Sequence, residues 1–407
     1  MAALGVGSAG AQTEVDWAQE RAQVERLGAL TQVPAMRAAE GVAVEGNLRP
    51  IYFDGLAWQG KPTRVFAWLG LPSQAQAKGK GKVPGVVLVH GGGGTAFKEW
   101  VQKWNAAGFA AISIAVEGQT DRRNPSDKKA WMRHPWAGPA RSGIYHDSDQ
   151  PLTDQWMYHA VADTILAHSL LRSLPEVDAE QVGLAGISWG GVITSTVMGI
   201  DSRFAFAIPI YGCGNLADAP NQYGRSLGNN PWYRKVWDPM LRLEKARMPA
   251  LWFSWPNDSH FPMDSVAACV KKAGGPQMIS LVPGMRHGHG PGWNRPESYA
   301  FAQGVVASGK PWAAEIRAEE QGGVATFVFR SSRKIDRAEL VSTTDGGVSG
   351  SRKWVSTPAR VEQMRDQTVV RAPVPAGTTA WYLNGLSGDI VVSSSYQEVA
   401  AGAKGPR

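Results

Sequence analysis

Short apolar segments that alternate with helical patterns constrain the fold of this chain more than any other feature. The apolar segments are residues 85–90, 109–116, 182–187, 206–211, 250–255 and 278–283. Helical periodicity is found in residues 95–107, 152–173, 189–199, 264–273 and 297–308. Parallel strands need long crossover connections, and such crossovers are usually helices. The pattern therefore predicts an α/β fold with a mostly parallel sheet covered by helices.

The segments on either side of this alternating region have different patterns of apolar and polar residues. Residues 14–28 have the pattern of a short amphipathic helix, and we expect an N-terminal helical segment over 14–48. The α/β domain is expected over 49–311, opening with an antiparallel pair of strands. After Lys310-Pro311, short alternating segments separated by turn signals predict a small all-β, Ig-like sandwich over 318–400.

The first residues of the chain carry a possible export signal. Residues 1–11 are small and apolar and end in Ala9-Gly10-Ala11, which resembles a signal-peptidase cleavage site. We expect residues 1–13 to be the remnant of a signal peptide and the protein to be periplasmic or secreted. The alternative is an Ala/Gly-rich end without a targeting role.

Composition excludes several classes of protein. The two cysteines, Cys213 and Cys269, permit one disulfide at most, so the fold does not depend on a disulfide framework. No window approaches the about 18 consecutive apolar residues of a membrane span. The net charge of +7 comes from scattered Lys and Arg, which predicts no nucleic-acid partner. The sequence carries no signal for an oligomeric state.

The strongest chemical motif is GISWGG at residues 186–191, directly after one predicted strand and directly before a predicted helix. A G-x-S-x-G motif in that context predicts a nucleophile elbow, a sharp turn that presents Ser188 at the end of the strand. The alternative is a plain tight turn between strand and helix. A serine nucleophile needs a base and an acid, which follow it in the chain order Ser, Asp or Glu, His.

Two loops downstream of Ser188 offer these partners. Asp258 follows the strand at 250–255 and is the expected acid. Asp264, its competitor, falls where capping of the next helix would explain it. After the strand at 278–283, His287 and His289 compete for the role of base, and His287 is favoured because it comes first. No third ligand cluster accompanies this H-x-H pair, so we expect neither a metal nor a cofactor.

An oxyanion hole needs backbone N–H groups that point at the developing negative charge. We expect them from Trp189, which follows the nucleophile, and from Gly92 and Gly93 in the HGGGG run after the strand at 85–90. His90, at the start of that run, is expected to be a structural hydrogen-bonding residue. The run lacks the spacing of a dinucleotide-binding or P-loop motif.

A long, mostly irregular segment at 117–155 is expected to form a wall of the site, because loops of this length in compact domains are usually functional. Its aromatic residues and one beyond the histidines are candidates for stacking on sugar rings. These candidates are Trp131, Trp136, Tyr145, Trp156 and Trp293. The alternative is that these rings only pack the loop onto the body of the domain.

Several segments together resemble a known family. HGGGGTAFKEW, HDSDQPLTDQWMYHAV, GISWGG and RHGHGPGW are similar to segments of secreted bacterial α/β-hydrolases of the acetyl-xylan-esterase-like or dienelactone-hydrolase-like group. The similarity covers roughly residues 40–310. Dienelactone hydrolases use a Cys nucleophile where this chain has Ser188, and glucuronoyl esterases carry Arg where it has Trp189.

The resemblance implies a serine carboxylic-ester hydrolase that removes acyl groups, most simply acetyl, from a carbohydrate or polysaccharide through an acyl-enzyme on Ser188. Two alternatives remain: a peptidase of the prolyl-oligopeptidase type, and an inert carbohydrate-binding protein. The expected sandwich contains no candidate triad residue. A chain ending near Pro311 is therefore expected to keep its activity on a small soluble ester.

Overall fold

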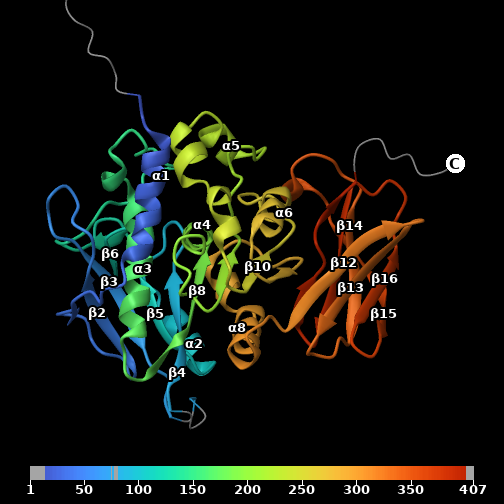
Figure 1. Ribbon diagram of the computed structural model, residues 1–407, viewed down its shortest axis with the longest axis horizontal. Helices are drawn as coiled ribbons and strands as arrows, with labels where there is room; N and C mark the ends of the chain where they lie inside the picture. Colours follow the sequence, from blue (N-terminus) through green and yellow to red (C-terminus); the bar gives the residue numbers. More distant parts are fainter. Residues whose placement is uncertain (1–13, 75, 78–80, 400–407) are drawn as a thin grey trace, which may run out of the picture.

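The protein consists of a helix-covered mixed sheet and a smaller β-sandwich, which lie side by side (Figure 1). The computed structural model describes residues 14–74, 76–77 and 81–399. The expected signal-peptide remnant, residues 1–13, lies outside the described residues. In the described part of the chain, no helix has both the length and the apolar character needed to cross a bilayer.

The large sheet has the strand order β1-β2-β3-β5-β4-β8-β9-β10-β11. Pairing is antiparallel from β1 to β5 and parallel from β5 to β11. The strands are β1 (Met36–Ala38), β2 (Leu48–Asp54), β3 (Arg64–Gly70), β4 (Val83–Val89), β5 (Ala110–Ile114), β8 (Val177–Ile187), β9 (Ala207–Ile210), β10 (Ala250–Ser254) and β11 (Gln277–Leu281). The α/β fold class predicted from the sequence is confirmed.

Helices connect the parallel strands. They are α2 (Lys98–Ala106), α3 (Trp156–Arg172), α4 (Trp189–Val197), the short α5 (Gln222–Leu227) and α6 (Met263–Lys272). α8 (Glu297–Ser308) follows β11 and leads into the C-terminal strands, and α1 (Trp17–Glu25) and α7 (His289–Trp293) are shorter helices outside these connections. α2 packs against α8, where the rings of Trp104 and Tyr299 lie 4.8 Å apart. α3 packs against α4 and against strands β4 and β8. Each parallel strand thus has its backbone groups paired and its apolar side chains buried.

The C-terminal strands form two layers. They are β12 (Ala313–Gln321), β13 (Val324–Ser331), β14 (Arg337–Thr343), β15 (Val355–Gln363), β16 (Thr368–Pro373), β17 (Ala380–Ser387), β18 (Ile390–Ser393) and β19 (Gln397–Glu398). One layer runs β12-β13-β16-β15, and the other runs β15-β14-β17, with β18 and β19 on β17. Phe327, Phe329, Leu340 and Leu383 are fully buried between them.

The two parts of the molecule meet at β11. β18 pairs antiparallel with β11 at Ile279 and Ser393. Leu281 N donates to Ser393 Oγ at 2.8 Å, and Asn384 Nδ2 donates to Leu281 O at 3.2 Å. The sandwich is therefore docked along the last strand of the large sheet.

Three segments differ from the sequence-based expectation. The segment 14–48 is helical only in its first part, because β1 pairs with β2 as a short strand. The long segment 117–155 contains a hairpin of β6 (Gln119–Arg123) and β7 (Trp131–Arg133). The first strand of the sandwich already begins at Ala313, ahead of the expected boundary at 318.

Candidate active site

The nucleophile elbow lies where β8 ends and α4 begins. Ser188 has φ 58° and ψ −116°, a strained backbone conformation for a residue with a side chain. The flanking glycines are required by close approach of the backbone. A Cβ on Gly186 would lie 2.0 Å from the carbonyl oxygen of Gly190, and a Cβ on Gly190 would lie 2.0 Å from that of Val89.

Three side chains from three loops converge at this point. The Nε2 atom of His287 lies 3.0 Å from Ser188 Oγ, and its Nδ1 atom lies 2.8 Å from Asp258 Oδ2. The loops follow β8, β10 and β11, so all three side chains lie at the carboxyl edge of the parallel strands. Because Nδ1 faces a carboxylate, it carries the ring proton, and Nε2 is free to accept the hydroxyl proton of Ser188.

Asp258 is fully buried and firmly held. Its Oδ1 accepts the backbone N–H groups of His260 and Phe261 at 2.8 and 3.0 Å, and its Oδ2 also accepts Trp255 Nε1 at 3.2 Å. The competing Asp264 lies in the first turn of α6. The structure thus brings Asp258, and not Asp264, against the imidazole.

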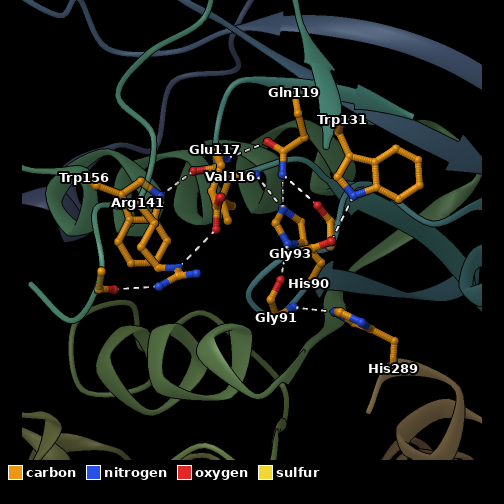
Figure 2. A network of polar contacts seen from close by, with 12 residues as sticks. His90, Gly91, Gly93, Val116, Glu117, Gln119, Trp131, Arg141, Trp156 and His289 are labelled. Atoms are coloured by element: carbon orange, nitrogen blue, oxygen red, sulfur yellow. Dashed lines mark hydrogen bonds and ion pairs between the residues drawn. The ribbon is translucent and has the colours of Figure 1, made fainter. Parts of the chain in front are cut away.

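The glycine run after β4 is held by side chains that bind its carbonyl groups (Figure 2). His90 Nδ1 donates to Gly91 O at 2.7 Å, Trp131 Nε1 donates to Gly93 O at 2.9 Å, and Gln119 Nε2 donates to Gly94 O at 2.9 Å. Residues 91–94, which we call the glycine loop, are therefore held in place by hydrogen bonds to their carbonyl groups.

Fixing a carbonyl also fixes the next amide, because C=O and N–H are antiparallel across a trans peptide. The bond from His90 to the Gly91 carbonyl thus orients the N–H of Gly92 away from His90. The N–H groups of Gly92, Gly93 and Trp189 have no hydrogen-bond partner among the described residues. They are available as donors to an oxyanion.

His90 has the structural role expected from the sequence. Its Nε2 accepts the backbone N–H of Val116 at 3.1 Å, and the ring is buried. Burial lowers the pKa of His90 to about 4, so the imidazole is neutral at physiological pH. It connects the glycine loop to the end of β5.

His289 lies on the glycine loop and not on the nucleophile. Its Nε2 accepts the N–H of Gly91 at 2.9 Å (Figure 2). Burial, with the nearby His90 and His287 next in importance, lowers the pKa of His289 to about 4, which keeps Nε2 unprotonated as an acceptor. Sequence reasoning missed this role, because the H-x-H spacing does not tell which ring faces which loop.

Two charged residues at the site were also missed. The Arg141 guanidinium lies 5.1 Å from the centre of the Trp189 ring and pairs with Glu117 at 3.3 Å. A Cβ on Gly92 would lie 2.9 Å from Arg141 Nη2. Desolvation raises the pKa of Glu117. No motif marks either residue, because both lie in the irregular segment 117–155.

The aromatic candidates fall into three groups. Tyr145 and Trp156 are buried, with ring centres 5.7 and 5.8 Å from that of Trp189, so they support the elbow from behind. Trp136 is exposed and packs on Tyr52 and Arg64 of β2 and β3. For these three rings the structure favours the packing alternative over direct contact with substrate.

Trp131 and Trp293 are different, because both are partly exposed and lie beside the glycine loop. The ring of Trp293 is 5.0 Å from Phe97 and 6.1 Å from His289. Both tryptophans line one pocket. Within the described part of the chain, no group of three or more His, Cys, Asp or Glu side chains is arranged to hold a metal.

Comparison with known proteins gives two family matches. Residues 40–217 match the acetyl xylan esterase (AXE1) family model, and residues 146–304 match the prolyl oligopeptidase family model. A search of curated proteins found no match.

Solved structures share the fold at low identity. Acetyl xylan esterase 1 from Thermoanaerobacterium sp. JW/SL YS485 is 18% identical, with a TM-score of 0.51, over 66% of this chain and 87% of that one. An acetyl xylan esterase from Paenibacillus sp. R4 is 19% identical, with a TM-score of 0.50, over 68% and 91%. At this identity the likeness establishes the fold. The chain has the α/β-hydrolase fold, and its residues 40–217 are similar to the acetyl xylan esterase family.

Proposed function

We propose that this protein is a serine carboxylic-ester hydrolase that removes acetyl groups from a polysaccharide, in the periplasm or outside the cell. The observation that carries the proposal is the chain of contacts from Ser188 Oγ through His287 to Asp258, at 3.0 and 2.8 Å. The match to the acetyl xylan esterase model supports the acetyl group and the carbohydrate carrier.

The geometry supports a two-step reaction. His287 Nε2 takes the hydroxyl proton as Ser188 Oγ attacks the ester carbonyl, and Asp258 stabilises the imidazolium that forms. The free N–H groups of Gly92, Gly93 and Trp189 are the proposed donors to the oxyanion. His287 then protonates the departing sugar oxygen, which leaves an acetyl ester on Ser188. A water that gives a proton to His287 attacks this ester, and His287 returns the proton to Ser188 Oγ as acetate leaves.

The decisive experiment compares the wild type with Ser188→Ala on 4-nitrophenyl acetate and on an acetylated polysaccharide. Loss of the nucleophile should lower kcat by about 10⁴-fold or more, with an unchanged circular dichroism spectrum, since only one hydroxyl is removed. A variant that keeps a tenth of the wild-type rate would remove Ser188 from the mechanism.

A second candidate function is that of a serine peptidase, because residues 146–304 match the prolyl oligopeptidase model. The same catalytic set can attack an amide. Parallel assays with 4-nitrophenyl acetate and an aminoacyl anilide, each with and without a serine-reactive phosphonate, distinguish the two. Phosphonate-sensitive hydrolysis of the anilide at a rate similar to that of the ester would favour the peptidase.

A further inference from the structure

A pocket of about 280 Å³ lies next to the glycine loop, on the side of α2. Its walls combine aromatic and charged side chains: Phe97, Trp131, Trp293, Lys98, Glu99 and Asp121. Aromatic walls with a few polar groups are typical of sites for small organic molecules.

The aromatic walls are held in fixed orientations. The Trp131 indole donates to Gly93 O at 2.9 Å, and the Arg123 guanidinium lies 3.4 Å from the centre of its ring. The Trp293 ring lies 5.8 Å from the ring of the buried Trp100. A ligand that stacks here would therefore bind with little loss of side-chain conformational entropy.

The charged side chains carry both signs. Lys98, whose ammonium pairs with Glu45 at 2.6 Å, keeps further N–H donors, and Glu99 and Asp121 supply acceptors. Asp121 is held in place by Trp68 Nε1, which donates to its Oδ2 at 3.1 Å. This mixture fits a neutral molecule with apolar faces and a rim of hydroxyl groups better than an ion of either sign.

The pocket begins at Thr95, directly after the glycine loop, and Trp131 in its wall binds that loop. A Cβ on Gly91 would lie 2.8 Å from the Cβ of Ser188, whereas the carbonyl of Gly93 binds Trp131 (Figure 2). His289, which binds the Gly91 amide, lies between this loop and the rings of Phe97 and Trp293. The glycine loop thus connects Ser188 to the pocket.

We propose that this pocket is a binding subsite for a neutral pyranose ring, the neighbour in the polysaccharide of the sugar that carries the ester. The proposal rests on the proposed function for its link to catalysis, but the binding of a sugar can be measured without it. Because Trp131 and His289 connect the pocket to the glycine loop, sugar binding should also favour the transition state. Binding energy from a remote part of a substrate is commonly used in this way.

The first test compares kcat/KM for acetylated xylotriose and for 4-nitrophenyl acetate, which cannot reach the pocket. Trp293→Leu removes one stacking face and should lower kcat/KM on the trisaccharide by about tenfold, with less than about a threefold change on the small ester. The matched control is Trp136→Leu, because that exposed ring packs on β2 and β3 and lines no part of the pocket. Equal losses on both substrates would overturn the proposal.

The second test measures binding without turnover, in the Ser188→Ala protein titrated with unacetylated xylotriose and mannotriose. Quenching of tryptophan fluorescence should report saturable binding of at least one trisaccharide, and Lys98→Met or Trp293→Leu should weaken it several-fold. Lys98 is about a third exposed, so its substitution keeps the fold even if Trp293→Leu does not. Absence of binding by both trisaccharides would overturn the subsite. Failure of the wild type to hydrolyse esters would instead overturn the proposed function.

Discussion

At the scale of single residues, the two histidines of the H-x-H pair have different partners. His287 contacts the proposed nucleophile, Ser188, and the proposed acid, Asp258, whereas His289 accepts the amide N–H of Gly91. His287→Ala should therefore lower kcat about as much as Ser188→Ala. His289→Leu should lower kcat by roughly 10- to 100-fold with little change in KM, because it frees a loop that supplies oxyanion donors.

The conservative variant separates a positioning role from simple packing. His289→Gln keeps an acceptor for the Gly91 amide and should recover part of the lost kcat, which steady-state kinetics on 4-nitrophenyl acetate would show. If His289→Leu were as inactive as His287→Ala, or fully active, the assigned role would be wrong.

Whether the role of a residue can be predicted from the sequence depends on the structural pattern of the segment around it. Ser188, Asp258 and His287 could be proposed because each follows an apolar strand, and parallel strands end at one edge of the sheet. Tyr145 and Trp156 were proposed as sugar-binding residues, yet both are buried behind Trp189. An irregular segment has no periodicity to show which of its rings point inward.

At the scale of elements, helix α3 carries a carboxyl group at a buried position, where the charged form is destabilised. Asp163 lies on this nearly fully buried helix, and its Oδ1 has no hydrogen-bond partner among the described residues. Burial raises the pKa of Asp163 to about 8. The folded protein therefore holds a neutral carboxyl at pH 7, whereas the unfolded chain holds an ionised one.

This difference makes stability depend on pH. Between the ordinary pKa of about 4 and the folded value, the folded state binds one more proton than the unfolded state, so the free energy of unfolding falls as pH rises. Asp163→Asn removes the titrating group. It should therefore raise the free energy of unfolding at pH 8 by about 1–3 kcal/mol, with a smaller effect at pH 5. Urea unfolding at both pH values measures it.

A matched control is Asp389→Asn, whose side chain is 90% exposed. It should change the free energy of unfolding equally little at both pH values. If Asp163→Asn destabilised the protein at pH 8, the carboxyl would have a partner that the amide cannot replace.

The sequence predicts long elements better than short ones. The strands β4, β5 and β8 to β11 and the helices between them agree with the apolar pattern to within a few residues at most ends, because buried parallel strands are continuous apolar runs. β8 is the exception, since it begins at Val177, five residues before the apolar run. β1 is exposed along its whole length, β7 is mostly exposed and β6 is buried only at its first two residues, so these strands carry no such signal. Each of them pairs with a strand near it in the chain, β1 with β2 and β6 with β7, yet no apolar run marks these short strands.

At the scale of the whole molecule, the sandwich contacts the loop that carries the proposed acid. Asn257 Nδ2 donates to Arg352 O at 2.8 Å, and Met263 N donates to Ser349 Oγ at 2.9 Å. A Cβ on Gly350 would lie 2.4 Å from the carbonyl oxygen of Asp258. The short turn at 349–352 therefore packs directly against the backbone of the loop that carries Asp258, which we call the acid loop.

This contact changes what truncation should do. Reasoning from the sequence predicts that a chain ending near Pro311 keeps its activity on a small ester, but the structure predicts a loss, because Asp258 would lose its support. Gly350→Ala tests the contact in the full chain and should lower kcat on 4-nitrophenyl acetate by about tenfold, since the acid must shift away from His287.

Gly346→Ala is the control, because a Cβ there meets no atom within 4 Å. It should leave kcat unchanged. Equal activity of both variants would show that the sandwich does not influence the acid loop.

The docking of β18 on β11 also bears on how the protein avoids self-association. An unpaired strand at the end of a sheet is a template for pairing with other chains, and natural proteins protect such strands. At one end of the large sheet, β1 is short and carries Arg37, which pairs with Asp54. At the other end the sandwich covers β11, so its removal should make the protein aggregate through strand addition.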